Sequence, residues 1–233
     1  MFSIERREEI LRILETSKSI RVEKLSKMLY VSQPTIRRDL SYLEEEGKVC
    51  RTHGGVVLRK SAESEIPLLL RESSNSRPKQ IIAEKAIRHV KDGDVIFLDA
   101  SSTVAYIVPL LTAFQDIIVL TNSPKTSIHL GSLNIKSYCP GGLLLPHSVA
   151  YVGSETERFI AGMNANILFF SSRGYTEGGC ITDSSAEEAA VKKAMIKNAE
   201  KVFYLCDSSK RGKTYMYNIC RTAEVDAVIS ETD

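Results

Sequence analysis

The sequence lacks the features that mark disulfide-rich, metal-binding and membrane-spanning proteins. Its five cysteines and four histidines are scattered, no two cysteines form a CxxC pair, and the cysteine count is odd, so neither a disulfide framework nor a metal site is predicted. No apolar run approaches the roughly 18–20 residues needed to span a bilayer, and no signal-peptide core is present. Neither a GxGxxG motif nor a Walker loop occurs, so no nucleotide cofactor is implied. These absences predict a cytoplasmic protein with reduced thiols, no cofactor and no membrane partner.

The small overall charge hides an asymmetry between the two ends of the chain. The 233 residues are 43% hydrophobic and 26% charged, which suits a small domain followed by a larger one. Residues 1–60 hold 13 Lys and Arg against 9 Asp and Glu, a net of +4, and the remainder holds 18 against 20, a net of −2. These sum to the formal charge of +2. The N-terminal part is therefore the one suited to a nucleic acid.

That basic part has the spacing of a helix-turn-helix. Ile36, Leu40 and Leu43 recur at i, i+4 and i+7, so they share one face of a helix. A shorter apolar stripe lies in residues 22–29, and the turn between the two helices falls at Tyr30. In this motif the polar face of the second helix enters the major groove of DNA.

A basic hairpin follows the second helix. Gly47 is a natural helix end, residues 48–53 alternate as a short strand, and Gly54-Gly55 permits a tight turn, which together predict a wing. The simpler alternative is a small three-helix bundle with a charged surface. The predicted DNA contacts come from the second helix and the wing: Ser32, Gln33, Pro34, Thr35, Arg37, Arg38, Ser41, Lys48, Arg51 and His53.

The ordered pattern TIRRDL, LEEEGK and RTHGG resembles the DNA-binding end of a DeoR-type bacterial transcriptional regulator. Tyr30 departs from that resemblance, because the family often has a small residue such as Gly or Asn in the turn. The resemblance implies a winged helix-turn-helix domain over residues 1–58, followed by a linker over residues 59–77.

Residues 78–233 alternate between apolar strands and helices, which predicts a mostly parallel sheet covered on both faces. We expect the first helix to open at Pro78. The predicted strands are residues 94–99, 116–121, 135–139, 166–171, 201–206 and 225–230, and the later helices are residues 103–114, 124–130, 154–163 and 186–199.

Polar side chains follow several of these strands. Three hydroxyls at 101–103 come after the first strand and open a helix, where they could surround a phosphate or simply cap that helix. Glu188 and Lys192, four residues apart on one helix, could equally form a surface ion pair. Because ligands bind at the carboxyl ends of parallel strands, several polar ends together predict a small polar ligand.

The segments DGDVIFLDASST, VLTNS, EEAAVKKAMI and CDSSK resemble the sensor domain of the same family, which is similar in fold to ribose-5-phosphate isomerase. The resemblance implies a phosphorylated sugar effector. The implied effector-binding residues are Asp99, Ser101, Ser102, Thr103, Asn122, Gly141, Gly142, Glu188, Lys192, Asp207 and Lys210.

The loop after the buried strand of residues 166–171 differs from the family pattern. It contains Arg173, which could clamp a phosphate or face solvent, where the family usually has an Asp. Arg211 likewise stands where an aromatic residue is common. Isomerases of the similar fold carry acidic residues in this loop, and here none occurs before Glu177, which favours a sensor over an enzyme.

The sequence therefore predicts a sequence-specific transcriptional regulator that is not an enzyme. We expect a repressor of sugar-metabolism genes, acting on a double-stranded DNA operator as a homodimer or higher homo-oligomer. The alternative is a sugar-phosphate isomerase-like enzyme with an accessory DNA-binding head.

Overall fold

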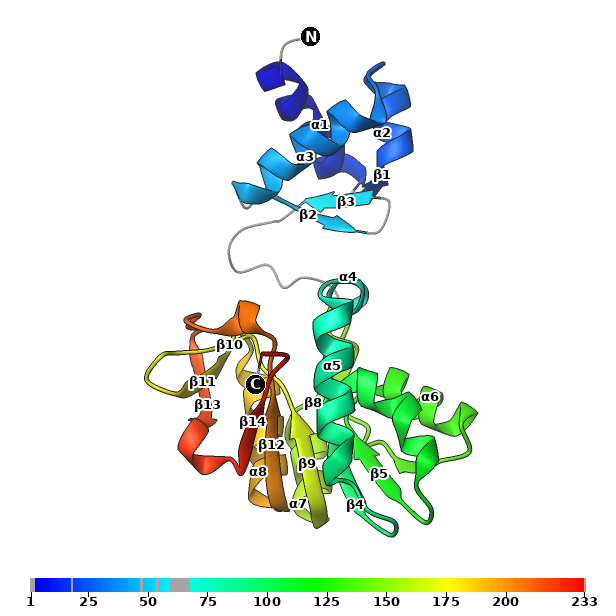
Figure 1. The fold of residues 1–233 in the computed structure, drawn as a ribbon, viewed down its shortest axis with the longest axis vertical. Coiled ribbons are helices and arrows are strands. Elements are labelled where there is room, and N and C mark those ends of the chain that lie inside the picture. Colours follow the sequence, from blue (N-terminus) through cyan, green and yellow to red (C-terminus); the bar gives the residue numbers. More distant parts are fainter. Residues whose placement is uncertain (1–2, 18, 47, 53–54, 59–67, 233) are drawn as a thin grey trace. The chain divides into compact units, whose positions relative to one another are not determined.

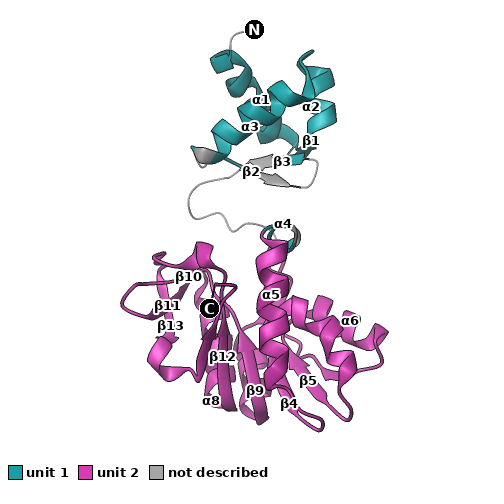
Figure 2. Cartoon of the chain, in the orientation of Figure 1, with its two compact units in different colours: residues 1–74 teal, residues 75–233 magenta. Residues whose placement is uncertain are grey.

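The computed structural model describes residues 3–17, 19–46, 48–52, 55–58 and 68–232. The chain forms two compact units, unit 1 over residues 1–74 and unit 2 over residues 75–233 (Figure 2). The division between them falls within the predicted linker of residues 59–77, and part of that linker is helical.

Unit 1 combines short helices with a small antiparallel sheet, whose strand order is β1-β3-β2. Its elements are α1 (Ser3–Ser17), β1 (Ser19–Arg21), α2 (Val22–Met28), α3 (Gln33–Glu45), β2 (Val49–Thr52), β3 (Gly55–Leu58) and α4 (Leu68–Ser73). This arrangement confirms the predicted winged helix-turn-helix. Strand β1 was not predicted, because three residues are too few to show an alternating pattern.

The predicted apolar face of α3 forms the core of unit 1. Ile36, Leu40 and Leu43 are fully buried there, together with Leu14 of α1 and Leu25 of α2. Burial of this stripe, more than helix propensity, holds so short a helix in place.

The start of α3 also agrees with the prediction from the sequence. Ser32 is the N-cap, and its hydroxyl accepts a hydrogen bond from the backbone N–H of Thr35 at 3.4 Å. Pro34 lies in the first turn, where its missing N–H costs no helical bond. The preceding turn places Tyr30 in the left-handed region, at φ 52°.

Unit 2 is built on a six-stranded sheet of order β14-β12-β9-β4-β5-β6, and every neighbouring pair in it is parallel (Figure 1). The strands of this sheet are β4 (Val95–Leu98), β5 (Ile118–Thr121), β6 (Lys136–Tyr138), β9 (Ala165–Phe170), β12 (Ala199–Leu205) and β14 (Ala227–Ile229). All six predicted strands are present, with slightly different bounds.

Helices cover both faces of this sheet, as predicted. One apolar layer lies between the sheet and α5, η2 and α6, and the other lies between the sheet and α7 and α8. The helical elements are α5 (Ser76–Ala86), η1 (Ile87–His89), η2 (Val104–Ala113), α6 (Pro124–Ser132), α7 (Ser154–Ala161), α8 (Ala186–Lys197), η3 (Ser208–Lys210) and η4 (Thr222–Glu224).

Two details of these helices differ from the prediction. The helix expected over residues 103–114 is the 3-10 helix η2, and it contains Pro109, which has no N–H to donate to a regular α-helical ladder. Helix α5 opens at Ser76 rather than at Pro78, which instead lies in the first turn.

In the described part of unit 2, five short strands outside the large sheet were not predicted. A three-stranded sheet of order β10-β11-β13 contains β10 (Gly174–Tyr175), β11 (Cys180–Asp183) and β13 (Tyr217–Arg221), and a hairpin pairs β7 (Leu143–Leu145) with β8 (Ala150–Val152). Strands of two to five residues carry too little local pattern to be recognised, and their pairing is set by the surrounding fold.

Candidate nucleic-acid interface and ligand site

Helix α3 presents a polar face to solvent. Pro34, Arg37 and Arg38 are exposed, and Gln33 and Ser41 are half-buried beside them. The two arginines thus lie on the face that the spacing predicted for DNA.

Several predicted contact residues on α3 are held by local hydrogen bonds. The hydroxyls of Ser32 and Thr35 lie 2.9 Å apart, and the hydroxyl of Ser41 donates to the carbonyl of Arg37 at 3.0 Å. These bonds order the hydroxyls at the start and along one side of the polar face.

The predicted wing is the hairpin of β2 and β3, in which Val49 pairs with Leu58. Lys48, directly before β2, is exposed, and its ammonium lies 2.8 Å from the Glu46 carboxylate. Their hydrogen bond raises the pKa of Lys48 and lowers the pKa of Glu46. The side chain of Arg51 and the whole of His53 lie outside the described residues, so their DNA contacts stay predictions.

One acidic side chain of α3 points inward. Asp39 is buried and accepts hydrogen bonds from the Nε atoms of Arg6 at 2.5 Å and Arg7 at 3.2 Å. The guanidinium of Arg7 also lies 3.6 Å from the centre of the Tyr42 ring. Asp39 was not predicted to be buried, although it stands at i+3 from Ile36, within the apolar stripe.

In unit 2, two lysines meet hydroxyls at the carboxyl ends of β4 and β9. The ammonium of Lys210 lies 2.6 Å from the hydroxyl of Ser171 and 3.3 Å from that of Thr103, and the ammonium of Lys79 lies 3.1 Å from the hydroxyl of Ser102. We call this group of five residues the lysine–hydroxyl cluster. The structure therefore joins three of the predicted site residues to Lys79 and Ser171.

Lys79 was not predicted as a site residue. It lies on α5 and is buried, on the same helical face as Ile82 and Ala86. A lysine at i−3 from an apolar stripe was the available signal, because burying an ammonium group costs free energy unless partners surround it.

Asp207, also predicted, lies beside the lysine–hydroxyl cluster. Burial works to raise its pKa, but the charge of Lys210, the hydroxyl of Ser209 and the charge of Lys79 together hold the pKa below the ordinary value. Asp207 thus remains a carboxylate that partly balances both lysines.

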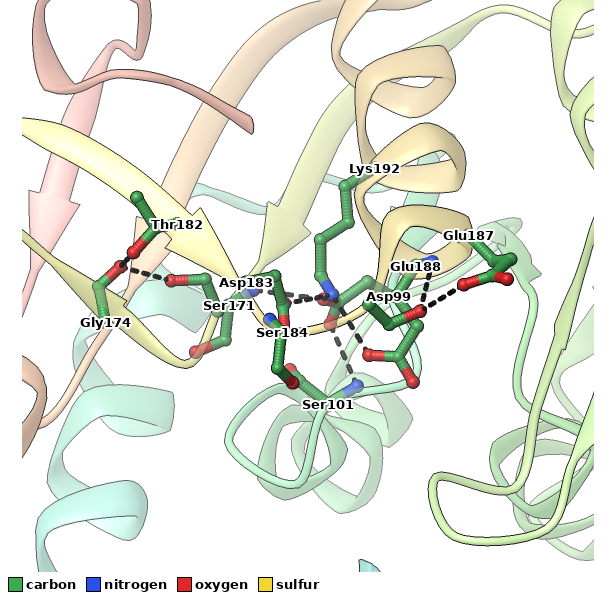
Figure 3. Close-up of polar contacts among 12 residues, drawn as sticks. Asp99, Ser101, Ser171, Gly174, Thr182, Asp183, Ser184, Glu187, Glu188 and Lys192 are labelled. Carbon is green, nitrogen blue, oxygen red and sulfur yellow. Dashed lines mark hydrogen bonds and ion pairs between the residues drawn. The ribbon is translucent and has the colours of Figure 1, made fainter. Parts of the chain in front are cut away.

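A second cluster contains three carboxylates around one ammonium (Figure 3). The Nζ atom of Lys192 lies 2.9 Å from Asp183 Oδ2, 3.6 Å from Glu188 Oε2 and 3.9 Å from Asp99 Oδ2. We call these four residues the carboxylate cluster. Because all four side chains are buried, the alternative of a surface ion pair between Glu188 and Lys192 is wrong.

The charges of the carboxylate cluster shift each other's titration. Burial works to lower the pKa of Lys192, but Asp183, Glu188 and Asp99 outweigh it and raise the pKa above the ordinary value. Burial raises the pKa of Asp99, although the charge of Lys192 and the hydrogen bonds from Ser101 and Ser171 work to lower it. Asp183 was missed in the sequence, because it stands in the short strand β11 with no surrounding pattern.

Asp99 connects the two clusters. Its Oδ1 accepts from the backbone N–H of Ser101 at 3.0 Å, and its Oδ2 accepts from the backbone N–H of Ser171 at 3.2 Å. Since the hydroxyl of Ser171 bonds Lys210, a ligand that meets the lysines would lie close to buried carboxylates.

Three other predicted positions, Asn122, Gly141 and Gly142, have partners or close neighbours within unit 2. Asn122 is buried and donates from Nδ2 to the carbonyl of Tyr151 at 3.0 Å, while its Oδ1 has no hydrogen-bond partner among the described residues. Gly142 has φ 140°, and a Cβ there would collide with Thr156, whose hydroxyl donates to the carbonyl of Gly141 at 2.8 Å. The backbone and the close approach of Thr156 explain a glycine at position 142, whereas a Cβ at position 141 would meet nothing within 4 Å.

The glycines also line a surface depression of about 500 Å³, together with Glu155, Arg158 and Phe159. Arg173 is half-buried in the loop between β9 and β10, and its contact with a phosphate stays a prediction. Within residues 3–232, leaving out those that are not described, no group of three or more His, Cys, Asp or Glu could hold a metal ion, and no helix could cross a membrane.

The chain thus combines a winged helix-turn-helix, a fold that binds DNA, with a separate α/β unit that carries charged side chains at its strand ends. Residues 6–62 match the DeoR-like helix-turn-helix domain, and residues 74–232 match the DeoR C-terminal sensor domain. The chain belongs to the DeoR family of transcriptional regulators.

Individual relatives extend over almost the whole chain. The chain is 37% identical over 233 residues to the HTH-type transcriptional regulator YulB of Bacillus subtilis, which is 100% of this chain and 90% of that protein. It is 33% identical to the L-fucose operon activator of Escherichia coli, covering 97% and 94% of the two chains. It is 29% identical to the lactose phosphotransferase system repressor of Staphylococcus epidermidis, covering 100% and 94%.

Among solved structures, eIF2B delta from Chaetomium thermophilum is similar with a TM-score of 0.51 at 17% identity, over 70% of this chain and 58% of that one. Ribose 5-phosphate isomerase A from Methanocaldococcus jannaschii gives a TM-score of 0.45 at 19% identity, over 59% of this chain and 55% of its own. Likeness at such identities concerns the fold alone.

Proposed function

We propose that this regulator is a repressor of sugar-metabolism genes whose DNA binding is controlled by a phosphorylated sugar bound in unit 2. The observation that carries the proposal is the lysine–hydroxyl cluster, in which Lys79 and Lys210 bring two ammonium groups to the hydroxyls of Ser102, Thr103 and Ser171. A phosphate is an anion with several acceptor oxygens, and ammonium and hydroxyl donors supply the complementary charge and hydrogen bonds.

The carboxylate cluster suits the sugar part of the same effector. Asp99 lies one backbone hydrogen bond from Ser171, so carboxylate oxygens lie near a phosphate bound by the lysines. A carboxylate accepts hydrogen bonds from sugar hydroxyls, which would discriminate a sugar phosphate from inorganic phosphate.

The names of the relatives include both a repressor and an activator, so they do not fix the direction of control. We choose repression, and expect a symmetric homodimer or a higher homo-oligomer that binds a palindromic or repeated operator. The effector would act by binding one state of the regulator more tightly than the other.

The ligand proposal is tested by thermal unfolding of the protein with a panel of sugar phosphates, each beside its unphosphorylated parent. A ligand that binds only the folded state raises its stability. We expect one phosphate to raise the midpoint in a saturable way and its parent to have no effect. Lys79→Met and Lys210→Met should each reduce the shift, while Lys91→Met, at an exposed lysine, should leave it unchanged. Equal shifts in all three variants would show that the ligand binds elsewhere.

The DNA proposal is tested separately by operator binding. Arg38→Ala should weaken binding by about 1–3 kcal/mol, because Arg38 is exposed on the polar face of α3. Arg12→Ala, which removes an exposed arginine of α1 paired with Glu9, should change binding little. Affinity should also fall as salt rises, because bound phosphates release counterions.

One observation favours the alternative of an isomerase. The loop after β9 has no acidic residue before Glu177, but the structure brings Asp99, Asp183 and Glu188 together from other elements. A positioned carboxylate is what removal of a sugar C2 proton requires. Incubation with aldose and ketose phosphates in heavy water distinguishes the two functions, because an isomerase would exchange that proton and a sensor would bind without exchange.

A further inference from the structure

The residue at which unit 2 begins is bonded to the proposed ligand site. Asn75 is the first residue of unit 2 and the N-cap of α5, and it adopts the left-handed conformation at φ 52° and ψ 37°. Asn is one of the few residues that tolerate this conformation, so the backbone here does not need glycine. Its side chain makes no capping bond to α5.

That side chain instead bonds a loop 132 residues further along the chain. The Nδ2 atom of Asn75 lies 3.2 Å from Asp207 Oδ1 and 3.3 Å from the hydroxyl of Ser209. Asn75 itself is exposed, whereas Asp207 is buried. The amide therefore joins an exposed chain junction to a buried carboxylate.

The backbone of Asn75 leads to the other side of the same site. Its carbonyl accepts from the N–H of Lys79 at 3.1 Å, in the first turn of α5. The loop that its side chain bonds carries Lys210, whose N–H donates to the carbonyl of Asp207 at 3.0 Å. One residue at the junction thus contacts both segments that hold the cations of the lysine–hydroxyl cluster.

We propose that the contact of Asn75 with Asp207 and Ser209 transmits effector occupancy to the start of α5, and hence to the segment through which the chain enters unit 2. This inference rests on the proposed phosphate site. Asp207 is now balanced by the charges of Lys79 and Lys210. A phosphate that takes up both ammonium groups adds negative charge beside Asp207 and competes for the same cations. The carboxylate and the loop then shift, and the bonds that hold Asn75 change with them.

Asn75 is a positioning residue, since it is proposed to act through Asp207 and Ser209 and not by touching the effector. Its test therefore needs a measurement that separates effector binding from the change that binding causes at the start of α5. Backbone hydrogen–deuterium exchange provides one, since it reports local opening segment by segment. The protein is compared in chloride and in the sugar phosphate that stabilises it most in the panel, or in inorganic phosphate where no sugar phosphate does. We expect ligand to change the exchange of residues 74–79 several-fold, together with that of residues 101–103 and 207–211.

Asn75→Gly is the informative variant, because glycine keeps the left-handed backbone and removes only the amide. We expect it to retain the ligand-dependent change at residues 101–103 and to lose the change at residues 74–79. Asn134→Gly is the matched control, since Asn134 is also exposed and left-handed, at φ 57°, in another part of unit 2. It should behave as the unsubstituted protein does.

Failure of the proposed phosphate site and failure of the Asn75 inference would give different exchange patterns. No ligand-dependent change at residues 101–103 or 207–211 in the unsubstituted protein would overturn the phosphate site and this inference with it. A change at those residues, with residues 74–79 unaffected or equally affected in Asn75→Gly, would overturn the inference alone.

Discussion

Unit 1 buries Asp39 between two arginines, and unit 2 buries the carboxylate cluster around Lys192. These two groups of charged side chains carry opposite excess charge. In unit 1, Asp39 meets the two arginines Arg6 and Arg7, so cations are in excess. In unit 2, Lys192 meets three carboxylates, so anions are in excess.

The difference lies in how each excess charge is solvated. The arginine side chains of unit 1 are 12% and 22% exposed, so part of their charge reaches water, and the cluster ties α1 to α3. Lys192 and its partners are at most 9% exposed. Buried charge without water must be neutralised by protons or by ligand groups. The first cluster therefore ties two helices of unit 1 together, while the second holds an excess of buried negative charge.

The largest effect in this comparison is expected from removing Lys192, the ammonium group of the carboxylate cluster. Lys192→Met leaves three buried carboxylates facing one another, and should destabilise unit 2 by about 3–5 kcal/mol. Urea unfolding measures this change. Lys193→Met on the same helix removes an exposed lysine and should cost less than about 0.5 kcal/mol. Equal stability of the two variants would show that the carboxylate cluster does not depend on its ammonium.

The corresponding change in unit 1 should have a smaller effect. Asp39→Ala leaves Arg6 and Arg7 without their carboxylate, but both can turn toward water, so we expect a loss of about 2 kcal/mol. Glu9→Ala, which breaks an exposed pair with Arg12, should cost less than about 1 kcal/mol. Thermal unfolding of unit 1 that is unchanged by Asp39→Ala would show that this cluster does not tie the two helices together.

The pH dependence of stability should reveal the excess negative charge in unit 2. Burial raises the pKa of Asp99 above its ordinary value of 3.8. As pH falls, this carboxyl therefore takes up a proton at a higher pH in the folded protein than in the unfolded chain. That uptake stabilises the folded state as pH falls from neutral toward 3.8, and the contribution is lost as pH rises through the folded pKa. Asp99→Asn cannot titrate. The stability of the unsubstituted protein relative to Asp99→Asn should therefore increase with acidification, and a constant difference would count against the raised pKa.

The smallest effect concerns the turn of unit 1. Tyr30 is left-handed and 94% exposed, so its ring gains little from burial while its backbone is strained. Tyr30→Gly should raise the stability of unit 1 by less than about 1 kcal/mol, because glycine adopts this conformation without strain. Tyr30→Phe keeps the strain and should change nothing. A loss of stability in Tyr30→Gly would show that the ring makes a contact that stabilises the folded unit.

Some residues of the two candidate sites could be identified in the sequence and others could not. Arg37 and Arg38 are exposed as predicted, because the opposite face of their own helix is apolar, and their contact with DNA stays a prediction. Asp39 and Lys79 were not predicted, although each stands at helical spacing from buried apolar residues of its own helix. Asp183 offered no such signal, since it ends a four-residue strand.

The sequence by itself determined the features that depend on near neighbours in the chain. The buried face and N-cap of α3, the wing and the six strands of the parallel sheet follow from spacings of a few residues, and the family follows from ordered motifs. Only the tertiary structure decided which charges meet. Parallel strands bring their carboxyl ends to one edge, so Ser102, Ser171 and Lys210 come together although long segments separate them, and Lys79 meets Ser102 from the first turn of α5. Charge interactions depend on distance and burial, and both are set by packing rather than by position in the chain.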